Sequence, residues 1–315
     1  MSRKLLTLSA VAAATALALT ACGEADADSA DAGDNAVASG DAGVCAEFEP
    51  LRFSDTGVER LETLVLEFED FRVALEETTG LEVEFEPMAS RTAAATALEY
   101  DDLDVLLTGP AEYVALKEEA DAIPLTGVTR DNYKAAIFKR ADSDLESVED
   151  LEGTQVITKE VGSTSGHLGP LEMMDSAGLD PNAGDVEVMP LSDTHIEAFA
   201  TGDGDALGTG ISDLEALEEA MGDEEVEILA EGPDLPNDLF IARTGLGEDC
   251  AGYLQDSLNK NQDVLLEAIV QTGENDKYID SEFVDAEDAD YDPTRRAFEA
   301  AGFDQYADLP DEDEQ

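Results

Sequence analysis

Apolar positions along the chain follow the spacings of helices and strands in turn. Between residues 61 and 75, Leu and Phe recur three and four positions apart, which predicts the buried face of a helix ending near Gly80. Leu81, Val83 and Phe85 then alternate with acidic residues and predict a strand. Comparable short apolar runs predict further strands near residues 51–54, 104–107, 133–138, 155–158, 186–189, 206–209, 225–229 and 238–242.

Helical patterns separate these strands. An Ala-rich helix is expected over residues 92–98, Pro110 opens another, and Leu168, Leu171 and Met174 mark the face of a third. Strands that alternate with helices predict βαβ units and mostly parallel sheets, and hence an α/β fold. The strands are too many for one lobe, and 315 residues suit two lobes of ordinary size.

The N-terminus has a different pattern. Basic residues at positions 3 and 4 precede an apolar run from Leu5 to Leu19, which is short for a membrane span and predicts a secretory signal peptide. The run ends in Leu19-Thr20-Ala21-Cys22, which resembles a bacterial lipobox. We therefore expect residues 1–22 to be a lipoprotein signal with Cys22 lipidated, and the exported chain to be anchored on the outer face of the cell membrane. The alternative is an ordinary signal peptide with a chance cysteine.

Residues 23–44 are small, acidic and polar, with two valines, and predict a disordered tether because they have almost nothing to bury. Two cysteines remain after the lipobox, Cys45 and Cys250. Outside the cytoplasm such a pair is expected to form a disulfide. Two buried free thiols are the alternative.

Charge narrows the classes of partner. The chain has 76 Asp and Glu against 17 Lys and Arg, which gives a net charge of −59. Such a surface repels phosphate backbones and anionic lipid headgroups, so we do not expect the protein to bind nucleic acid. Acidic excess of this kind favours solubility and does not bear on the fold.

The segment Gly162-Ser163-Thr164-Ser165-Gly166 is the strongest local signal for chemistry. It lies between a predicted strand and a predicted helix, so three hydroxyls and free backbone N–H groups meet at a helix N-terminus. That end carries partial positive charge and suits a tetrahedral oxyanion. The alternative is that these residues only cap the helix.

Enzyme and metal sites have weaker support. The segment has Thr164 at its centre and so departs from the G-x-S-x-G nucleophile elbow, and two histidines cannot build a three-histidine metal site. The spacing of Asp288, Asp290, Asp292 and Glu299 matches a calcium loop, but Pro293 stands where that loop needs glycine. Asp292 is better explained as the cap of a helix with Pro293 at its first position. No metal and no cofactor are expected.

Four segments in order resemble the phosphate, phosphite and phosphonate-binding proteins of ABC transporters. Residues 161–170 (VGSTSGHLGP) are similar to that family's phosphonate-gripping loop, and 104–114 (DVLLTGPAEYV) to its segment ending in a binding tyrosine. Residues 191–200 (LSDTHIEAFA) resemble the segment carrying its cleft histidine, and 235–238 (LPND) its Pro-x-Asp turn.

This resemblance implies a two-lobed periplasmic-binding fold of type II, in which each lobe is a mostly parallel sheet flanked by helices. Lobe one would comprise residues 46–131 and 234–315, and lobe two residues 132–233. Two hinge strands, near residues 133–138 and 238–242, would join the lobes. Cys45 and Cys250 would then both fall in or beside lobe one, which makes their pairing plausible.

The resemblance also implies roles for residues. Ser163, Thr164 and Ser165 would grip the phosphoryl oxygens, Tyr113 would donate a hydrogen bond from the opposite lobe, and His195 would donate another. The alternative for His195 is a capping or core histidine.

Acidic residues meet the ligand's amine in aminophosphonate binders of this family. Asp238 fits that position, and Asp213 fits it with an alignment gap, although both could be ordinary solvated carboxylates. Where many relatives have Asp-Tyr, this chain has Ser90-Arg91. Arg91 could bind an oxyanion through two nitrogens or pair with surface acids. The first role shifts the expected ligand from aminophosphonates towards phosphate or phosphite.

The expected function is therefore that of a lipid-anchored, monomeric binding protein, not an enzyme. It would capture phosphate, phosphite or a phosphonate between its lobes and deliver it to an ABC permease. The alternatives are a secreted hydrolase of phosphorus esters that uses the serine-containing loop, and a ligand-sensing lipoprotein without a transporter.

Overall fold

The computed structural model describes residues 42–56, 60–88, 91–192, 194–222 and 225–307. Cys22, the signal run and nearly all of the expected tether lie outside these residues. The strands are β1 (Leu51–Asp55), β2 (Val83–Phe85), β3 (Val105–Thr108), β4 (Ile123–Val128), β5 (Lys134–Arg140), β6 (Gln155–Thr158), β7 (Glu187–Pro190), β8 (Ala206–Gly210), β9 (Val226–Asp234), β10 (Asp238–Ala242) and β11 (Phe283–Val284). The α-helices are α1 (Leu61–Thr79), α2 (Arg91–Glu99), α3 (Pro110–Ala120), α4 (Gly169–Ser176), α5 (His195–Thr201), α6 (Leu214–Met221), α7 (Gly247–Lys260), α8 (Gln262–Val270) and α9 (Asp292–Ala300).

The first sheet has six strands in the order β11-β4-β10-β3-β1-β2. Its strand β1 runs parallel to β2 and β3, whereas β10 runs antiparallel to β3 and β4. One face packs on α1, α7 and α8, where Phe53 and Phe240 meet Phe68 and Phe71. The other face, which includes Leu106, packs on α2 and α3.

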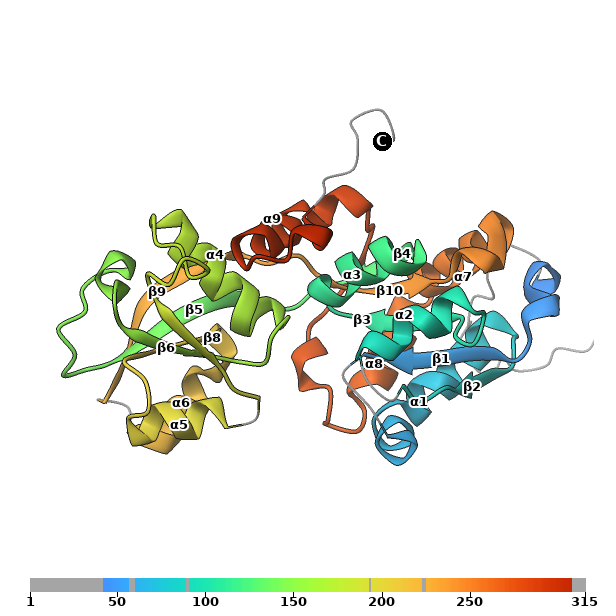
Figure 1. Cartoon of the computed structure of the whole chain (residues 1–315). Helices are drawn as coiled ribbons and strands as arrows, with labels where there is room; N and C mark the ends of the chain where they lie inside the picture. Colours follow the sequence, from blue (N-terminus) through green and yellow to red (C-terminus); the bar gives the residue numbers. More distant parts are fainter. Residues whose placement is uncertain (1–41, 57–59, 89–90, 193, 223–224, 308–315) are drawn as a thin grey trace, which may run out of the picture. The chain divides into compact units, whose positions relative to one another are not determined.

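The second sheet has five strands in the order β7-β6-β8-β5-β9. Strands β6, β7 and β8 are parallel, and β5 is antiparallel to β8 and β9. Successive residues of a strand point to opposite faces. Ile137 accordingly packs with α4, while Ala136 and Phe138 pack with α5 and α6. Helices therefore cover both faces of this sheet (Figure 1).

Both sheets are mixed, with a parallel part (β2-β1-β3 and β7-β6-β8) beside antiparallel strands. The expectation of parallel βαβ units holds for the first part of each sheet. The pattern misses β4, because Pro124 and Gly127 lie inside it and argue against a strand. Pro124 is tolerated because the β4–β10 register shifts next to its partner Ile241. It also misses β11, which has only two residues.

Helix boundaries follow the sequence signals closely. Helix α1 ends at Gly80, whose left-handed backbone (φ 71°) lets its N–H bond to the carbonyl of Glu76. Pro110 opens α3, as expected. Helix α9 includes Asp292 as its first residue, where the sequence places a cap, and the Asp292 carboxylate instead accepts a hydrogen bond from Arg295.

A disulfide joins Cys45 to Cys250, the pair expected from the sequence. Cys45 lies in the 3-10 helix Ala42–Phe48 and Cys250 in α7, and both side chains are buried. The bond therefore fixes the chain to the first sheet's helical layer just after the expected tether. None of the helices in the described ranges has the length and apolar character needed to span a membrane.

Candidate ligand-binding site

One pocket collects the residues that follow the ends of parallel strands. Asp55 ends β1, Thr108 ends β3 and Lys159 follows β6. The carboxyl ends of parallel strands are where α/β sheets bind ligands. We call this the hydroxyl pocket; its volume is about 240 Å³ and it is lined by Asp55, Thr56, Thr108, Gly109, Glu112, Arg130, Tyr133, Lys159, Glu160, Ser163, Thr164, Ser165, Asp238, Lys277 and Tyr278.

The structure brings the three residues of the expected gripping loop, Ser163, Thr164 and Ser165, to this pocket. A π-helical turn begins at Thr164 and runs into α4. Such turns are frequent at functional sites. The buried Thr164 hydroxyl accepts a hydrogen bond from the backbone N–H of Ala111 at 3.1 Å, at the start of α3. The loop thus joins the N-terminal ends of two helices, where partial positive charge favours an anion.

Gly166 explains part of the loop's sequence. A Cβ atom at this position would lie 2.4 Å from Cδ and 2.7 Å from Cβ of Lys159. The Gly166 carbonyl also accepts a hydrogen bond from the Lys159 N–H at 2.8 Å. The glycine therefore allows the loop to pack directly on the strand end that carries Lys159.

Three cationic side chains line the hydroxyl pocket, although the whole chain has only 17 Lys and Arg. Arg130 lies over the Tyr133 ring, 3.7 Å from its centroid, and 3.5 Å from the Asp238 carboxylate. Lys277 lies 3.9 Å from the same carboxylate. Burial raises the pKa of the Tyr133 phenol further above its ordinary value, which already keeps the hydroxyl protonated at neutral pH.

Asp238 supplies the acidic side of the pocket and is only 3% exposed. Its Oδ2 accepts a hydrogen bond from the Tyr278 hydroxyl at 2.8 Å. Its buried Oδ1 has no hydrogen-bond partner among the residues described, although Arg130 faces it. A buried acceptor of this kind favours a ligand that donates a hydrogen bond.

His195 and Asp213 form a pair of their own and are absent from the lining of the hydroxyl pocket. His195 Nε2 lies 3.3 Å from Asp213 Oδ2, and His195 Nδ1 lies 2.7 Å from the Ser192 carbonyl. Burial alone would raise the pKa of Asp213, but hydrogen bonds from His195 and Thr209 and the charge of Lys159 hold it below the ordinary value. Lys159 Nζ, 3.8 Å from Asp213, connects this pair to the pocket.

The structure places Tyr113 away from the hydroxyl pocket. Its ring is fully buried against Tyr291, with centroids 4.5 Å apart, and its hydroxyl donates to Asp288 at 2.7 Å. Asp288 also pairs with Arg295 at 2.7 Å, and Arg295 contacts Asp292. Asp288 and Asp292, two of the residues whose spacing matches a calcium loop, therefore form ion pairs with Arg295. Within the described residues no cluster of His, Cys, Asp or Glu could hold a metal ion.

Arg91 begins α2, and its side chain lies outside what the structure describes. Sequence reasoning missed all of the cations and tyrosines that line the pocket, namely Arg130, Tyr133, Lys159, Lys277 and Tyr278. A signal was present for Lys159, because it is the first residue after a predicted strand. Lys277 and Tyr278 lie in a 3-10 turn far along the chain and carry no such signal.

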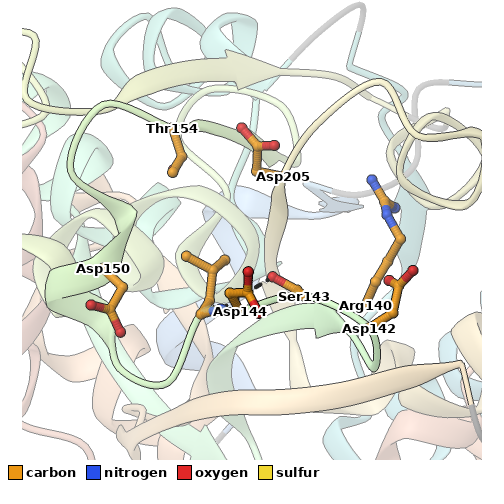
Figure 2. Close-up of a pocket in the computed structure, with 8 residues that line it drawn as sticks. Arg140, Asp142, Ser143, Asp144, Asp150, Thr154 and Asp205 are labelled. Carbon is orange, nitrogen blue, oxygen red and sulfur yellow. Dashed lines mark hydrogen bonds between the residues drawn. The ribbon is translucent and has the colours of Figure 1, made fainter.

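Figure 2 shows a second pocket, which we call the acidic pocket, beside the first turns after β5. Its Arg140 donates hydrogen bonds to the carbonyls of Phe199 and Gly204 and stacks on the Phe199 ring. Asp150 accepts hydrogen bonds from two backbone N–H groups. Arg140 and Asp150 therefore already make hydrogen bonds within the fold. The acidic pocket is lined by Arg140, Asp142, Ser143, Asp144, Leu145, Asp150, Thr154 and Asp205.

Solved structures share this fold at low sequence identity. A binding protein of an ABC phosphonate transporter from Pseudomonas aeruginosa has a TM-score of 0.61 and 17% identity, over 82% of this chain and 89% of that one. PhnD1 of Prochlorococcus marinus, in complex with methylphosphonate, has a TM-score of 0.61 and 19% identity, over 80% and 98%. XAC2383 of Xanthomonas citri, bound to ATP, has a TM-score of 0.63 and 17% identity, over 83% and 99%. These likenesses show the two-lobed periplasmic-binding fold of type II.

No curated protein matches the sequence. The model of one family matches residues 58–291, well over half of the chain, and describes an ABC transporter, phosphonate, periplasmic substrate-binding protein. The chain therefore belongs to this family of substrate-binding transporter components, which are not enzymes.

Proposed function

We propose that this exported binding protein captures a phosphonate, or the related oxyanions phosphite and phosphate, in the hydroxyl pocket and presents it to an ABC permease. One observation carries the proposal. Three hydroxyls at a helix start, Ser163, Thr164 and Ser165, share a pocket with three of the chain's few cations. In a chain of net charge −59, such a gathering of donors supports an anionic ligand.

The acidic side of the pocket refines the expected ligand. Asp238 Oδ1 is buried without a hydrogen bond of its own, so a ligand that also carries a donor would satisfy it. The amine of an aminophosphonate and the P–OH of a singly protonated phosphonate or phosphate both provide one. This arrangement favours ligands that present oxyanion and donor together, which a singly protonated phosphonate does as well as an aminophosphonate.

Roles follow for the remaining candidate residues. Ser163, Thr164 and Ser165 bind the phosphoryl oxygens, with Lys159 and Arg130 as the nearby cations. His195 and Asp213 act through Lys159, which lies between their pair and the pocket. Tyr113 holds Asp288 in the conformation described and serves the ligand indirectly.

Lipidation of Cys22 belongs to the same proposal. An acyl anchor followed by an acidic tether would keep a monomeric binding protein near its permease, since residues 23–44 have little to bury. Mass spectrometry of the mature N-terminus should find the lipid, and Cys22→Ala should release the protein from membranes. A mature N-terminus without lipid would refute this part alone. Size-exclusion chromatography would test the monomer.

Titration calorimetry tests the ligand. The panel is phosphate, phosphite, methylphosphonate and 2-aminoethylphosphonate, measured on the parent and on Lys159→Gln. Loss of a charged hydrogen bond costs about 1.5–3 kcal/mol, so the variant should bind roughly ten- to 150-fold more weakly. Lys139→Gln is the matched control, because Lys139 pairs with Glu227 outside the pocket. Failure of all four ligands to bind the parent would overturn the proposal.

A further inference from the structure

A third pocket, which we call the apolar pocket, lies among α2, α3 and the residues around α9. Its lining is mostly apolar, and its volume is about 250 Å³. Three of the chain's aromatic residues meet there: Phe298 contacts Phe303 and Tyr306, with centroids 6.0 and 5.1 Å apart. The space opposite them exists because the facing positions are small, notably Ala95, Ala111 and Ala115.

The apolar pocket adjoins the hydroxyl pocket. Glu112 lines both, and Val161 and Gly162 of the apolar pocket directly precede Ser163 of the other. The hydrogen bond from the Ala111 N–H to Thr164 Oγ1, at 3.1 Å, joins one lining residue of each pocket. Glu112 and the Ala111–Thr164 contact therefore form a wall that the two pockets share, so the pockets are neighbours.

Val161 strengthens this assignment. Its side chain is 56% exposed, although a branched apolar residue directly before a polar binding loop gains nothing from contact with water. In the apolar pocket it would contact an apolar group and lose that exposure. The carboxylates of Glu112 and Glu119 at the lining exclude a second anionic end from this position.

We infer that the apolar pocket receives the organic substituent of the ligand, so that the substrate class is phosphonates bearing an uncharged alkyl or aryl group of several carbons. This inference rests on the proposed function, since the phosphonyl group must first be held by Ser163, Thr164 and Ser165. It adds that the residues lining the apolar pocket select the organic substituent of the ligand. Methylphosphonate would fill the hydroxyl pocket alone.

Calorimetric titration of methyl-, propyl-, hexyl- and phenylphosphonate tests the inference. Each methylene that becomes buried should tighten binding about fourfold, so affinity should rise along the alkyl series until the pocket is full. Ala115→Phe, which places a ring in the apolar pocket only, should abolish this rise and leave methylphosphonate binding unchanged. The matched control is Ala216→Phe on the exposed face of α6, which should keep the rise.

A second variant guards against misfolding of the first. Phe303→Ala removes an aromatic wall and should reduce the gain from hexyl- and phenylphosphonate while methylphosphonate binds as before. Equal affinity of the parent for all four ligands would overturn the inference and leave the proposed function standing. Equal weakening of every ligand by both variants would also overturn it, because the pocket would then act through the fold. If the parent binds none of these four phosphonates, the inference fails, and titration with phosphate, phosphite and 2-aminoethylphosphonate decides whether the proposed function stands.

Discussion

The hydroxyl pocket and the acidic pocket both place an arginine among aspartates in a chain of net charge −59. In the acidic pocket Arg140 donates hydrogen bonds to backbone carbonyls, and Asp150 accepts hydrogen bonds from backbone N–H groups. In the hydroxyl pocket Asp238 keeps a buried oxygen without a hydrogen bond. The two pockets therefore differ in their cations, three against one, and in which polar groups the fold has already satisfied.

This difference shows how a site can be recognised in a very acidic protein. With 76 Asp and Glu, carboxylates gather by chance on any surface, so an acidic cluster says little. Cations and unsatisfied buried groups are rare, and their gathering in one place has a cost in folding that a ligand can offset. Substitutions matched between the two pockets test this view.

Asp238→Ala should have the largest effect. The carboxylate faces Arg130 and Lys277 and accepts the Tyr278 hydrogen bond, and removing one member of a buried ion pair costs about 3–5 kcal/mol of folding free energy. The matched variant in the acidic pocket, Asp142→Ala, changes an exposed residue and should stay within about 0.5 kcal/mol. Urea unfolding measures both. Similar losses for the two variants would mean that the pockets do not differ as described.

His167 gives the next largest effect, through acid. It is 4% exposed and lies two residues after Ser165, and burial lowers its pKa from about 6.5 to about 4, against the charge of Glu160. A folded pKa below the unfolded one means that the unfolded chain binds the proton first. Stability should therefore fall as pH drops from about 6.5 to about 4, by about 3 kcal/mol.

The variant His167→Leu isolates this contribution, because the other titrating groups are unchanged. The unfolding free energy of the parent minus that of the variant should decrease as pH falls through that window. A constant difference from pH 7 to pH 4 would show that His167 keeps an ordinary pKa.

The strand–helix alternation made the fold predictable, and its failures have local causes. Apolar spacing placed α1 and the strands that obey period two, because burial on one face leaves a direct trace in sequence. Strand β4 is buried from both sides and contains Pro124, so it has neither alternation nor a favourable composition. Antiparallel β5 and β10 look like any other apolar run, since strand direction depends on long-range pairing.

The sequence placed Ser163, Thr164 and Ser165 together because they are consecutive, and it also named Asp238, whereas the other residues that line the hydroxyl pocket were not predicted. Arg130 and Lys277 are separated by more than a hundred positions, and both pair with Asp238. Tyr113 shows the opposite case. It matches the family's motif, yet in this structure its hydroxyl donates a hydrogen bond to Asp288. A sequence motif predicts where a residue lies in the fold, whereas its hydrogen-bond partner depends on which other residues pack around it.

Removal of single hydroxyls should have a smaller effect, confined to binding. Ser163→Ala and Ser165→Ala should each cost about 1–3 kcal/mol if the lost bond is charge-assisted, or roughly five- to 150-fold in Kd. Thr164→Val should cost a similar amount and also destabilise the fold, because the Ala111 N–H loses its acceptor. Ser143→Ala in the acidic pocket is the control and should leave Kd unchanged. Unchanged affinity in all three loop variants would reduce the loop to a helix cap.

Salt should have the smallest effect, with an informative sign. Because the chain carries −59, long-range forces repel an anionic ligand, so in the proposed site the affinity must come from short-range donors. Added salt screens exposed charges over about 8 Å at physiological ionic strength, so it weakens the repulsion more than the buried contacts. Titration in rising concentrations of a salt whose anion does not compete should therefore show Kd falling or constant. Asp142→Asn with Asp144→Asn, exposed residues of the acidic pocket, should change this profile little, because two charges among so many are screened from the site. A Kd that rises steeply with salt would mean that attraction by a basic region recruits the ligand, and the contrast between the two pockets would then be the wrong explanation of binding.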